Sequence, residues 1–186
     1  AMCYTRGVPG DYDEWAAQGA PGWDWASVLP WFRRSERNER GSDALHGDDG
    51  PLYVSDLRYS NPLSHAFIEA GRQAGYTLND DFNGPRQDGF GLYQVTQKNG
   101  ARCSSAVAYL DPARNRRNLT VVTGAQANRI TFQHGRANGV VYRAKGRVFH
   151  EAAAREVLLS GGALNSPQLL MLSGIGPAMQ LRRHGI

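Results

Sequence analysis

Apolar positions in the first half of the chain recur at spacings of three and four, between polar and glycine-rich stretches, which is the pattern of amphipathic helices. Asp24 is a suitable N-cap for a helix whose apolar stripe runs to Phe32. A second helix begins at Asn61 and Pro62 and ends at Gly75, a residue that favours helix C-termini. Its apolar residues share one face: Leu63, Phe67, Ala70, Gly71 and Ala74.

Shorter elements surround these two helices. Residues 1–30 are rich in glycine, proline and aromatic side chains, which indicates ordered irregular structure with one short helix over 11–17. Residues 38–50 are polar and predict a loop. The apolar triplet 52–54 predicts a short strand.

The stretch 79–103 is again rich in glycine, asparagine and aspartate, with strand-like pieces over 90–96. A short helix follows, for which Ser104 or Ser105 is the N-cap. The dipeptide at 111–112, Asp-Pro, is expected to stop this helix.

The second half of the chain changes from helical spacing to β-branched runs. Turn residues at 133–136 and 145–146 separate these runs, so the pattern predicts a meander of short antiparallel strands. The expected strands are 119–123, 129–132, 139–143 and 148–150.

The segment 156–174 combines a strand, two glycines and a helix. Residues 156–160 are almost all apolar, as in a buried parallel strand, and the helix is expected to run from an N-cap at Asn165 to 173–174. The glycines at 161–162 allow close approach to the backbone, and a helix N-terminus favours an anion, so this unit suits a phosphate-bearing cofactor. The glycines do not match GxGxxG, and a tight packing turn is the alternative.

The composition is that of a folded protein, with 41% hydrophobic and 20% charged residues and a net charge of +4. These values exclude a disordered chain. No apolar run approaches the roughly 18 residues of a membrane span, and the N-terminus does not resemble a signal peptide. The arginines are spread over the chain without a nucleic-acid-binding module, so we expect no nucleic-acid partner.

Cysteine and histidine placement indicates no metal site. Cys3 and Cys103 are far apart and lack a CxxC motif, which favours a reducing, cytoplasmic compartment. His46 lies in a loop of glycines and aspartates, where we expect a solvated turn. The other histidines offer no general base: His65, His134, His150 and His184.

The run Gly162 to Pro177, GALNSPQLLMLSGIGP, resembles the second signature of the glucose–methanol–choline (GMC) oxidoreductase family. Residues 1–7, AMCYTRG, resemble the end of that family's first signature, where the chain covers the flavin. Within the family, the sequence looks most like the bacterial choline-dehydrogenase-like branch. Further segments fit in order along the chain: 11–15, 22–32, 46–52, 81–84, 89–91 and 102–110.

The resemblance implies a mixed fold, part α+β and part α/β. It comprises part of an FAD-binding Rossmann-like domain, with a strand–helix unit and an antiparallel β-meander, and the start of the substrate-binding domain. Residues 1–50 would be the flavin-covering segment, 51–115 the first part of the substrate-binding domain and 116–186 the return to the FAD domain. The family's GxGxxG would precede Ala1 and its catalytic His would follow Ile186, so we expect an internal segment of a longer enzyme.

The resemblance also places cofactor-binding residues. Ala1, Met2 and Cys3 match the part of the motif that touches the flavin, largely through backbone atoms, and an ordinary packed segment is the alternative. Ala127 matches a position whose backbone meets the adenine end of FAD, with a plain strand position as the alternative.

By the same resemblance, Ala163 and Asn165 lie near the nucleotide, and a plain N-cap is the alternative for Asn165. No residue of the chain matches the family's catalytic His, so we assign no catalytic residue and no metal ligand. Phe90, Tyr93 and Arg102 are candidates for lining the route to the substrate pocket.

The implied function is oxidation of a primary alcohol to an aldehyde by hydride transfer to the flavin of FAD, with oxygen or a quinone-type compound as electron acceptor. The partners would be the alcohol, the acceptor and the remainder of the same enzyme. The alternative is a non-catalytic fragment, inactive alone, because both the GxGxxG and the catalytic His are missing.

Overall fold

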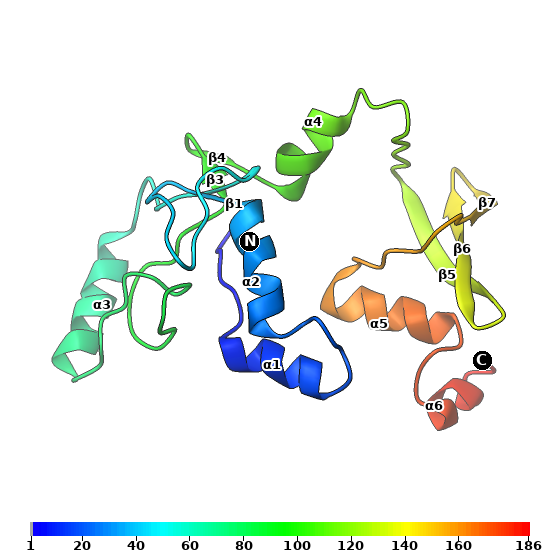
Figure 1. Cartoon of the computed structure of the whole chain (residues 1–186), viewed down its shortest axis with the longest axis horizontal. Coiled ribbons are helices and arrows are strands. Elements are labelled where there is room, and N and C mark those ends of the chain that lie inside the picture. The colour runs from blue at the N-terminus through cyan, green and yellow to red at the C-terminus, as the bar shows by residue number, and fades with distance from the viewer. Residues whose placement is uncertain (1) are drawn as a thin grey trace. The chain divides into compact units, whose positions relative to one another are not determined.

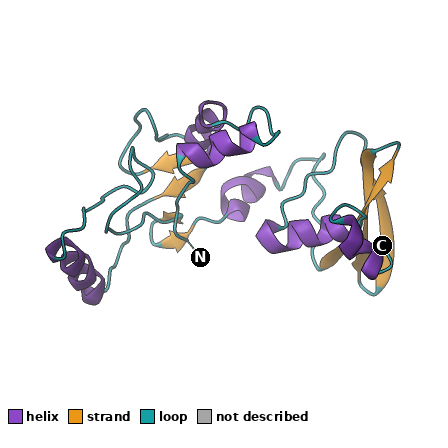
Figure 2. Cartoon of the chain, turned by 90° about the horizontal axis from the view of Figure 1, so that it is seen from below, coloured by secondary structure: helices purple, strands orange, loops and turns teal. Residues whose placement is uncertain are grey.

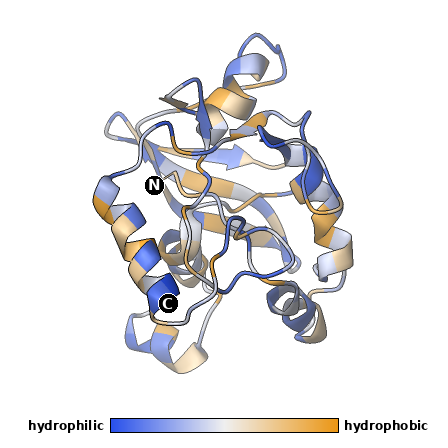
Figure 3. Cartoon of the chain, turned by 90° about the vertical axis from the view of Figure 1, so that its left-hand side faces the viewer, coloured by the Kyte–Doolittle hydropathy of each residue, from blue (hydrophilic) through white to orange (hydrophobic). Residues whose placement is uncertain are grey.

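The computed structural model describes residues 2–186, so Ala1 lies outside the described residues. The chain divides into two compact units, Ala1–Leu119 and Thr120–Ile186. Each unit contains both helices and strands, which confirms the mixed fold class (Figure 1). Within residues 2–186 no helix is long and apolar enough to cross a membrane, and polar residues interrupt the apolar ones along the ribbon (Figure 3).

The first two helices, α1 (Pro9–Ala17) and α2 (Trp25–Ser35), pack through aromatic side chains. Tyr12 of α1 is buried, and its ring centroid lies 5.7 Å from that of Phe32. Asp24 accepts a hydrogen bond from a first-turn amide of α2 at 3.0 Å, which confirms the predicted N-cap. Edge-to-face aromatic contacts of this kind hold the two helices together.

The helix α3 (Pro62–Gln73) begins and ends as predicted. Asn61 accepts a hydrogen bond from a first-turn amide at 2.9 Å, and the chain leaves the helix at Gly75, whose φ is +89°. The predicted apolar face is buried at Gly71 near its C-terminal end. The apolar residues nearer the N-terminus are exposed, at 77% and 66%: Leu63 and Phe67.

A short parallel pair follows α2. The strand β1 (Glu36–Asn38) pairs with β2 (Leu52–Val54), so the predicted strand 52–54 is confirmed. The strand β1 is polar, was not predicted, and overlaps the start of the predicted loop 38–50. Its Glu36 and Asn38 side chains are buried and hydrogen-bonded inside the unit. Because these residues are polar, the strand has no apolar signal in the sequence.

A hairpin joins β3 (Gln97–Lys98) to β4 (Ala101–Arg102). Its turn residues at 99–100, Asn-Gly, have φ of 51° and 80°, as a two-residue hairpin loop requires. The strand-like pieces predicted over 90–96 form isolated bridges instead of a continuous strand. Val95 has two such partners: Cys3 and Ser55.

A π-helical turn, Ala106–Leu110, continues directly into α4 (Asp111–Ala113). The prediction that the helix stops at Asp-Pro is therefore wrong. Pro112 lies in the first turn of α4, where an amide hydrogen has no intrahelical partner to lose. Of the two serines proposed as cap, Ser104 supplies the hydroxyl, which accepts from a helix amide at 3.3 Å.

The second unit contains a three-stranded antiparallel meander in the order β5 (Ala125–Gln133), β6 (Arg136–Ala144) and β7 (Arg147–Ala152), as predicted (Figure 2). The turns at 134–135 and 145–146 have positive φ at both positions. The second position of each turn is glycine, which adopts positive φ without steric cost, so each hairpin turn is specified by residues within the turn itself.

Two helices follow the meander, α5 (Gly162–Leu172) and α6 (Ala178–Arg183). Ser173, at the C-terminal end of α5, accepts a hydrogen bond from the Ile130 amide of β5 at 2.8 Å. Leu181 of α6 is buried. The helix α5 therefore lies against the first strand of the meander.

Two strand predictions in this unit are wrong. Residues 119–123 and 156–160 are irregular, and their apolar side chains are largely exposed, with Val122 at 52% and Leu158 at 82%. A β-branched or apolar run becomes a strand only when another strand pairs with it. Among residues 2–186 no segment pairs with either run.

Candidate functional site

The N-terminal segment, residues 2–6, is extended and held along its backbone. The Met2 carbonyl accepts a hydrogen bond at 2.8 Å, and the Tyr4 amide donates one at 2.9 Å, both to the backbone of 94–96. Cys3, between them, bridges this facing segment and has an exposed side chain. Met2 and Cys3, two of the residues predicted to touch the flavin through backbone atoms, therefore have a fixed backbone.

Asn83 holds the same segment through its side chain. Its Oδ1 accepts from the Arg6 amide at 2.7 Å, and its Nδ2 donates to the Tyr4 carbonyl at 3.0 Å. Gln87 adds a hydrogen bond from Nε2 to the Arg6 carbonyl at 2.7 Å. Asn83 is buried, and its side-chain amide pairs with the Arg6 amide and the Tyr4 carbonyl in the way that the backbone of a neighbouring strand would.

The Arg6 side chain ends in a buried ion pair with Glu36. Its Nη2 lies 2.7 Å from Glu36 Oε2, and the two side chains are 2% and 0% exposed. The other terminal nitrogen donates to the Leu45 carbonyl at 2.7 Å, and the guanidinium lies 5.1 Å from the centroid of the Phe32 ring. A buried ion pair is tolerated only when its remaining donors and acceptors are satisfied, and here they are.

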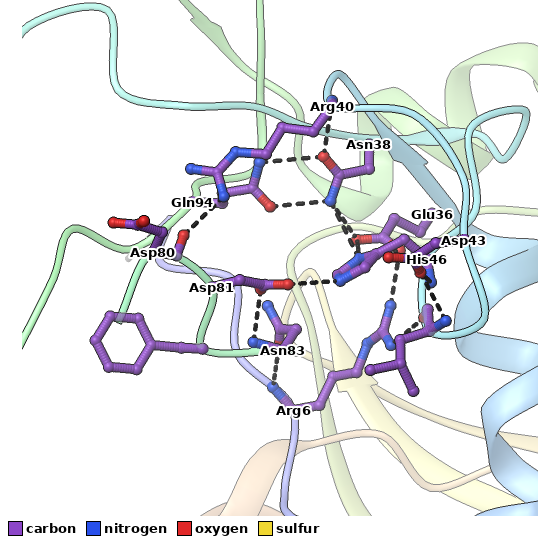
Figure 4. A network of polar contacts seen from close by, with 12 residues as sticks. Arg6, Glu36, Asn38, Arg40, Asp43, His46, Asp80, Asp81, Asn83 and Gln94 are labelled. Carbon is purple, nitrogen blue, oxygen red and sulfur yellow. Dashed lines mark hydrogen bonds and ion pairs between the residues drawn. The ribbon is translucent and has the colours of Figure 1, made fainter. Parts of the chain in front are cut away.

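His46 joins this ion pair, so the prediction of a solvated turn is wrong. The His46 side chain is 6% exposed, with Nδ1 3.1 Å from Glu36 Oε2 and Nε2 3.0 Å from Asp81 Oδ2 (Figure 4). The hydrogen bond to Glu36, with Asp81 nearby, raises the pKa of His46 above its ordinary value although burial opposes this.

Two glycines allow His46 to reach this position. A Cβ on Gly47 would lie 1.9 Å from the Arg33 carbonyl oxygen, and one on Gly50 would lie 2.4 Å from the Ser35 carbonyl carbon. The loop can therefore lie directly against the last turn of α2 and the start of β1. The sequence signal was the pair of glycines after His46, which marks close backbone approach.

A pair of side-chain amides connects this region to the N-terminal segment. Asn38 Nδ2 donates to Gln94 Oε1 at 2.9 Å, and Gln94 Nε2 donates back to Asn38 Oδ1 at 3.1 Å. Both side chains are buried. The strand β1 is therefore joined to the segment 94–96 that pairs with Met2 and Tyr4.

A separate cavity of about 380 Å³ lies beside α3 in the first unit. Phe90 and Tyr93 line it, while Arg102, the third candidate for the substrate route, does not. The charged residues on its wall include Arg40 and Asp56, which form an ion pair at 2.7 Å. The structure thus brings two of the three candidates together.

In the second unit, Ala127 and Asn165 line one hollow of about 470 Å³. Ala127 comes from β5 and Asn165 from the first turns of α5, which begins at Gly162. Asn165 is therefore not the N-cap, a role that falls to Gly161, which has no capping side chain. The remaining residues of the hollow are Ala125, Gln126, Leu159, Gly161, Gln168, Leu169 and Leu172.

The other predicted cofactor residues do not share this hollow. Ala163 is exposed in the first turn of α5 and is not among the residues that line it. Met2 and Cys3 belong to the first unit, and Ala1 lies outside the described residues.

The hollow is suited to binding and not to proton transfer. No titratable side chain lines it, and three side-chain amides offer donors and acceptors beside leucine side chains. The first-turn amides of α5 have no intrahelical acceptors and favour an anion. Gly162 has φ +90° and a Cβ there would meet nothing, so the backbone at this helix start is open. Within residues 2–186, no three His, Cys, Asp or Glu side chains are grouped to hold a metal ion.

Known proteins are similar to this chain in sequence and in fold. An oxygen-dependent choline dehydrogenase of Sinorhizobium fredii is 48% identical over 185 residues, which are 100% of this chain and 34% of the relative. Pyridoxine 4-oxidase from Mesorbium loti matches with a TM-score of 0.86 and 34% identity, covering 100% of this chain and 37% of that one. An FAD-dependent oxidoreductase from Chaetomium thermophilum matches with a TM-score of 0.83 and 29% identity, covering 100% and 35%.

The chain therefore spans about a third of the length of these relatives. The family model for GMC oxidoreductase matches residues 1–184, which include the run Gly162 to Pro177 that carries the resemblance. Because this match covers nearly the whole chain and the fold agrees with two solved oxidoreductases, the chain belongs to the GMC oxidoreductase family.

Proposed function

We propose that this chain is the segment of an FAD-dependent alcohol oxidoreductase that contacts the flavin and the adenosine of the cofactor. The observation that carries the cofactor assignment is that Ala127 and Asn165, far apart in sequence, line one hollow beside the start of α5. Membership of the GMC oxidoreductase family supports it, as does the fold shared with an FAD-dependent oxidoreductase.

The residues of the hollow fit the nucleotide end of FAD. Ala127 has a small side chain that leaves the β5 backbone accessible, and Asn165 and Gln168 offer amide groups. The open first turn of α5 suits the phosphates, with Ala163 at its surface. FAD would supply the hydride acceptor, while the backbone at Met2 and Cys3 would position the flavin.

No general base is assigned within residues 1–186. The proposed reaction, oxidation of a primary alcohol to an aldehyde, requires a group that removes the hydroxyl proton, and we place this group in the remainder of the enzyme. The 186-residue chain alone is therefore proposed to be inactive, since it spans 34% of the choline dehydrogenase relative. The same proposal assigns residues 1–50 and 116–186 to the FAD domain and 51–115 to the substrate-binding domain.

The choline dehydrogenase and pyridoxine oxidase relatives support an alcohol as the electron donor. We propose oxygen or a quinone-type compound as the acceptor. A reducing, cytoplasmic compartment is also proposed, and the two free thiols of Cys3 and Cys103 support it.

The test is to purify the full gene product and record its visible spectrum. We expect flavin absorbance that bleaches anaerobically on addition of an alcohol substrate. In the variant Ala127→Arg, which fills the hollow, we expect loss of retained FAD. The matched control is Ala152→Arg, an exposed position of β7 that does not line the hollow. A gene product without flavin, or equal FAD retention in both variants, contradicts the proposal.

A further inference from the structure

The first unit contains a buried charge cluster that the proposed function leaves without a role. It consists of two positive and two negative side chains in direct contact: Arg6, His46, Glu36 and Asp81. Glu36 belongs to β1, and His46 lies in the loop that Gly47 and Gly50 allow to pack against α2 and the start of β1. Burying these charged side chains removes them from water, which costs free energy. We therefore expect the cluster to do more than stabilise the fold.

We propose that the buried charge cluster is a positioning device for the N-terminal segment, residues 2–6, and that it requires His46 in its imidazolium form. The positioning follows from contacts within the first unit. Its consequence for the flavin rests on the proposed function, which places Met2 and Cys3 at the cofactor.

Two routes connect His46 to the N-terminal segment. The first passes through Glu36, whose Oε2 contacts both the imidazole and the Arg6 guanidinium. The second passes through Asp81, whose Oδ2 contacts His46 Nε2 and whose Oδ1 accepts from the Asn83 amide at 2.9 Å. The Asn83 side chain in turn holds the backbone of Arg6 at 2.7 Å. His46 is thus connected to the Arg6 side chain through Glu36, and to the Arg6 backbone through Asp81 and Asn83.

Both routes need a proton on each ring nitrogen. Nδ1 and Nε2 each face a carboxylate, and a neutral imidazole has one N–H, so one nitrogen would present its lone pair to an anion. Asn38 Nδ2 lies 3.2 Å from Nδ1, but it has only two hydrogens and already has two oxygen acceptors, Glu36 Oε1 at 3.1 Å and Gln94 Oε1 at 2.9 Å. The imidazolium is therefore the form that satisfies every contact.

Charged groups reach His46 from each neighbouring element. On its own loop, Asp43 Oδ1 accepts from the His46 amide at 2.7 Å. From α2, the Arg33 Nε donates to the His46 carbonyl at 3.3 Å. The remaining charged neighbours are the members of the cluster itself: Glu36 from β1, Asp81 from the loop after α3 and Arg6 through Glu36. The hydrogen bond to Glu36, with the charge of Asp81, raises the pKa of His46 above its ordinary value of 6.5. The imidazolium form therefore persists to a higher pH than in a free histidine side chain.

Deprotonation would release the second route first. Asp81 is the more exposed partner, with 32% of its side chain accessible, so water can replace its contact with Nε2. The Asn83 contact to Arg6 then loses its fixed anchor. The N-terminal segment is accordingly expected to open more often at alkaline pH than at pH 6.

The test measures hydrogen exchange at the Tyr4 and Arg6 amides in the whole chain, as protection factors at pH 6 and pH 9. We expect protection to fall by about tenfold at pH 9, the factor that one lost charge-assisted hydrogen bond contributes. The variant Asp81→Asn keeps an oxygen for the Asn83 amide but presents no carboxylate to Nε2, so this contact no longer depends on the charge of the imidazole. It is therefore expected to lack the tenfold fall in protection at pH 9.

The matched control is Asp80→Asn, which removes the same charge from the exposed neighbouring residue and leaves the His46 contacts intact. It should respond to pH as the unaltered chain does. Unchanged protection in the unaltered chain between pH 6 and pH 9, or a pH response in Asp81→Asn equal to that of Asp80→Asn, would overturn the positioning role.

A second measurement addresses the cofactor. In the full gene product, the flavin absorbance maximum is expected to shift between pH 6 and pH 9 in Asp80→Asn and to remain constant in Asp81→Asn. Bound flavin whose spectrum does not respond in Asp80→Asn overturns the link to the flavin. Absence of flavin overturns the proposed function instead, while the exchange experiment still decides the positioning role.

Discussion

The two units of the chain obtain their order in opposite ways. In Ala1–Leu119 the strands are two or three residues long, and buried polar side chains join segments that are distant in sequence. In Thr120–Ile186 the strands are longer and connected by two-residue turns, while large apolar side chains such as Leu158 remain exposed. The first unit depends on long-range hydrogen bonds, and the second on local hairpin chemistry.

This difference has a consequence for the site. The backbone of residues 2–6 is positioned by contacts with Asn83, Gln94 and Thr96, so a change far along the chain can move it. The hollow at Ala127 and Asn165 is built by the first strand of the meander and the helix that follows the meander. Substitutions in the first unit are therefore expected to act over long distances, and those in the second unit locally.

The largest expected effect is at Glu36. The substitution Glu36→Gln leaves Arg6 and His46 without their shared anion, and loss of one partner of a buried ion pair costs about 3–5 kcal/mol. All four tryptophans precede residue 32, so their fluorescence during urea unfolding reports on the first unit. The control is Glu69→Gln, an exposed partner of Arg72, which should leave the transition in place. An equal shift of the urea midpoint in Glu36→Gln and Glu69→Gln would contradict the larger effect of the buried ion pair.

A second large effect is expected at Gly47. In Gly47→Ala the added Cβ would lie 1.9 Å from the Arg33 carbonyl oxygen, and the backbone must shift, at a cost of about 3 kcal/mol. Gly10 in α1 has open space around its Cβ position, so Gly10→Ala is expected to add about 0.5 kcal/mol instead. Urea midpoints followed by tryptophan fluorescence compare the two. Similar urea midpoints for Gly47→Ala and Gly10→Ala would show that the loop does not need to lie directly against the Arg33 carbonyl.

A smaller effect is expected from pH. Because the folded-state pKa of His46 is raised, its contribution to stability is fully present below pH 6.5 and is lost as pH rises through the folded pKa. The loss is about 1.4 kcal/mol for each unit by which the pKa is raised. Urea unfolding by tryptophan fluorescence at pH 6 and pH 9 measures it. The variant His46→Gln should show a flatter dependence, and an equally steep one would assign the effect to other groups.

The smallest effect is expected in the β6–β7 turn. Lys145 has φ +50°, a region that asparagine tolerates better, so Lys145→Asn is expected to stabilise the hairpin by about 0.5 kcal/mol. Lys145→Val, with a β-branched side chain, should destabilise it by about 1 kcal/mol. Hydrogen exchange of the β6 and β7 amides measures both. A change in tryptophan fluorescence unfolding would contradict the local character of this unit.

Several elements could be predicted from sequence because their signals are local. Asp24 and Asn61 cap their helices as expected, and the glycine turns at 134–135 and 145–146 define the hairpins. The two wrong strand predictions share one cause. The runs 119–123 and 156–160 read as strands, yet a strand exists only with a partner, which no described residue supplies.

The sequence likewise indicated one part of the candidate site and missed another. The family resemblance indicated Ala127 and Asn165, and the structure adds that they line one hollow. Sequence reasoning missed the role of His46, because a histidine among glycines and aspartates looks like a solvated turn. Its partners Glu36 and Asp81 lie far from one another in sequence, so only folding brings their charges together.

The sequence by itself therefore determined the helix caps, the hairpin turns and the family of this protein, because each depends on residues close together in the chain or on a long ordered motif. Tertiary structure alone decided that polar residues such as Glu36 and His46 are buried and that apolar ones such as Leu158 are not. The physical reason is that burial depends on which segments meet, and a buried charge becomes tolerable only when its partners arrive from elsewhere in the chain.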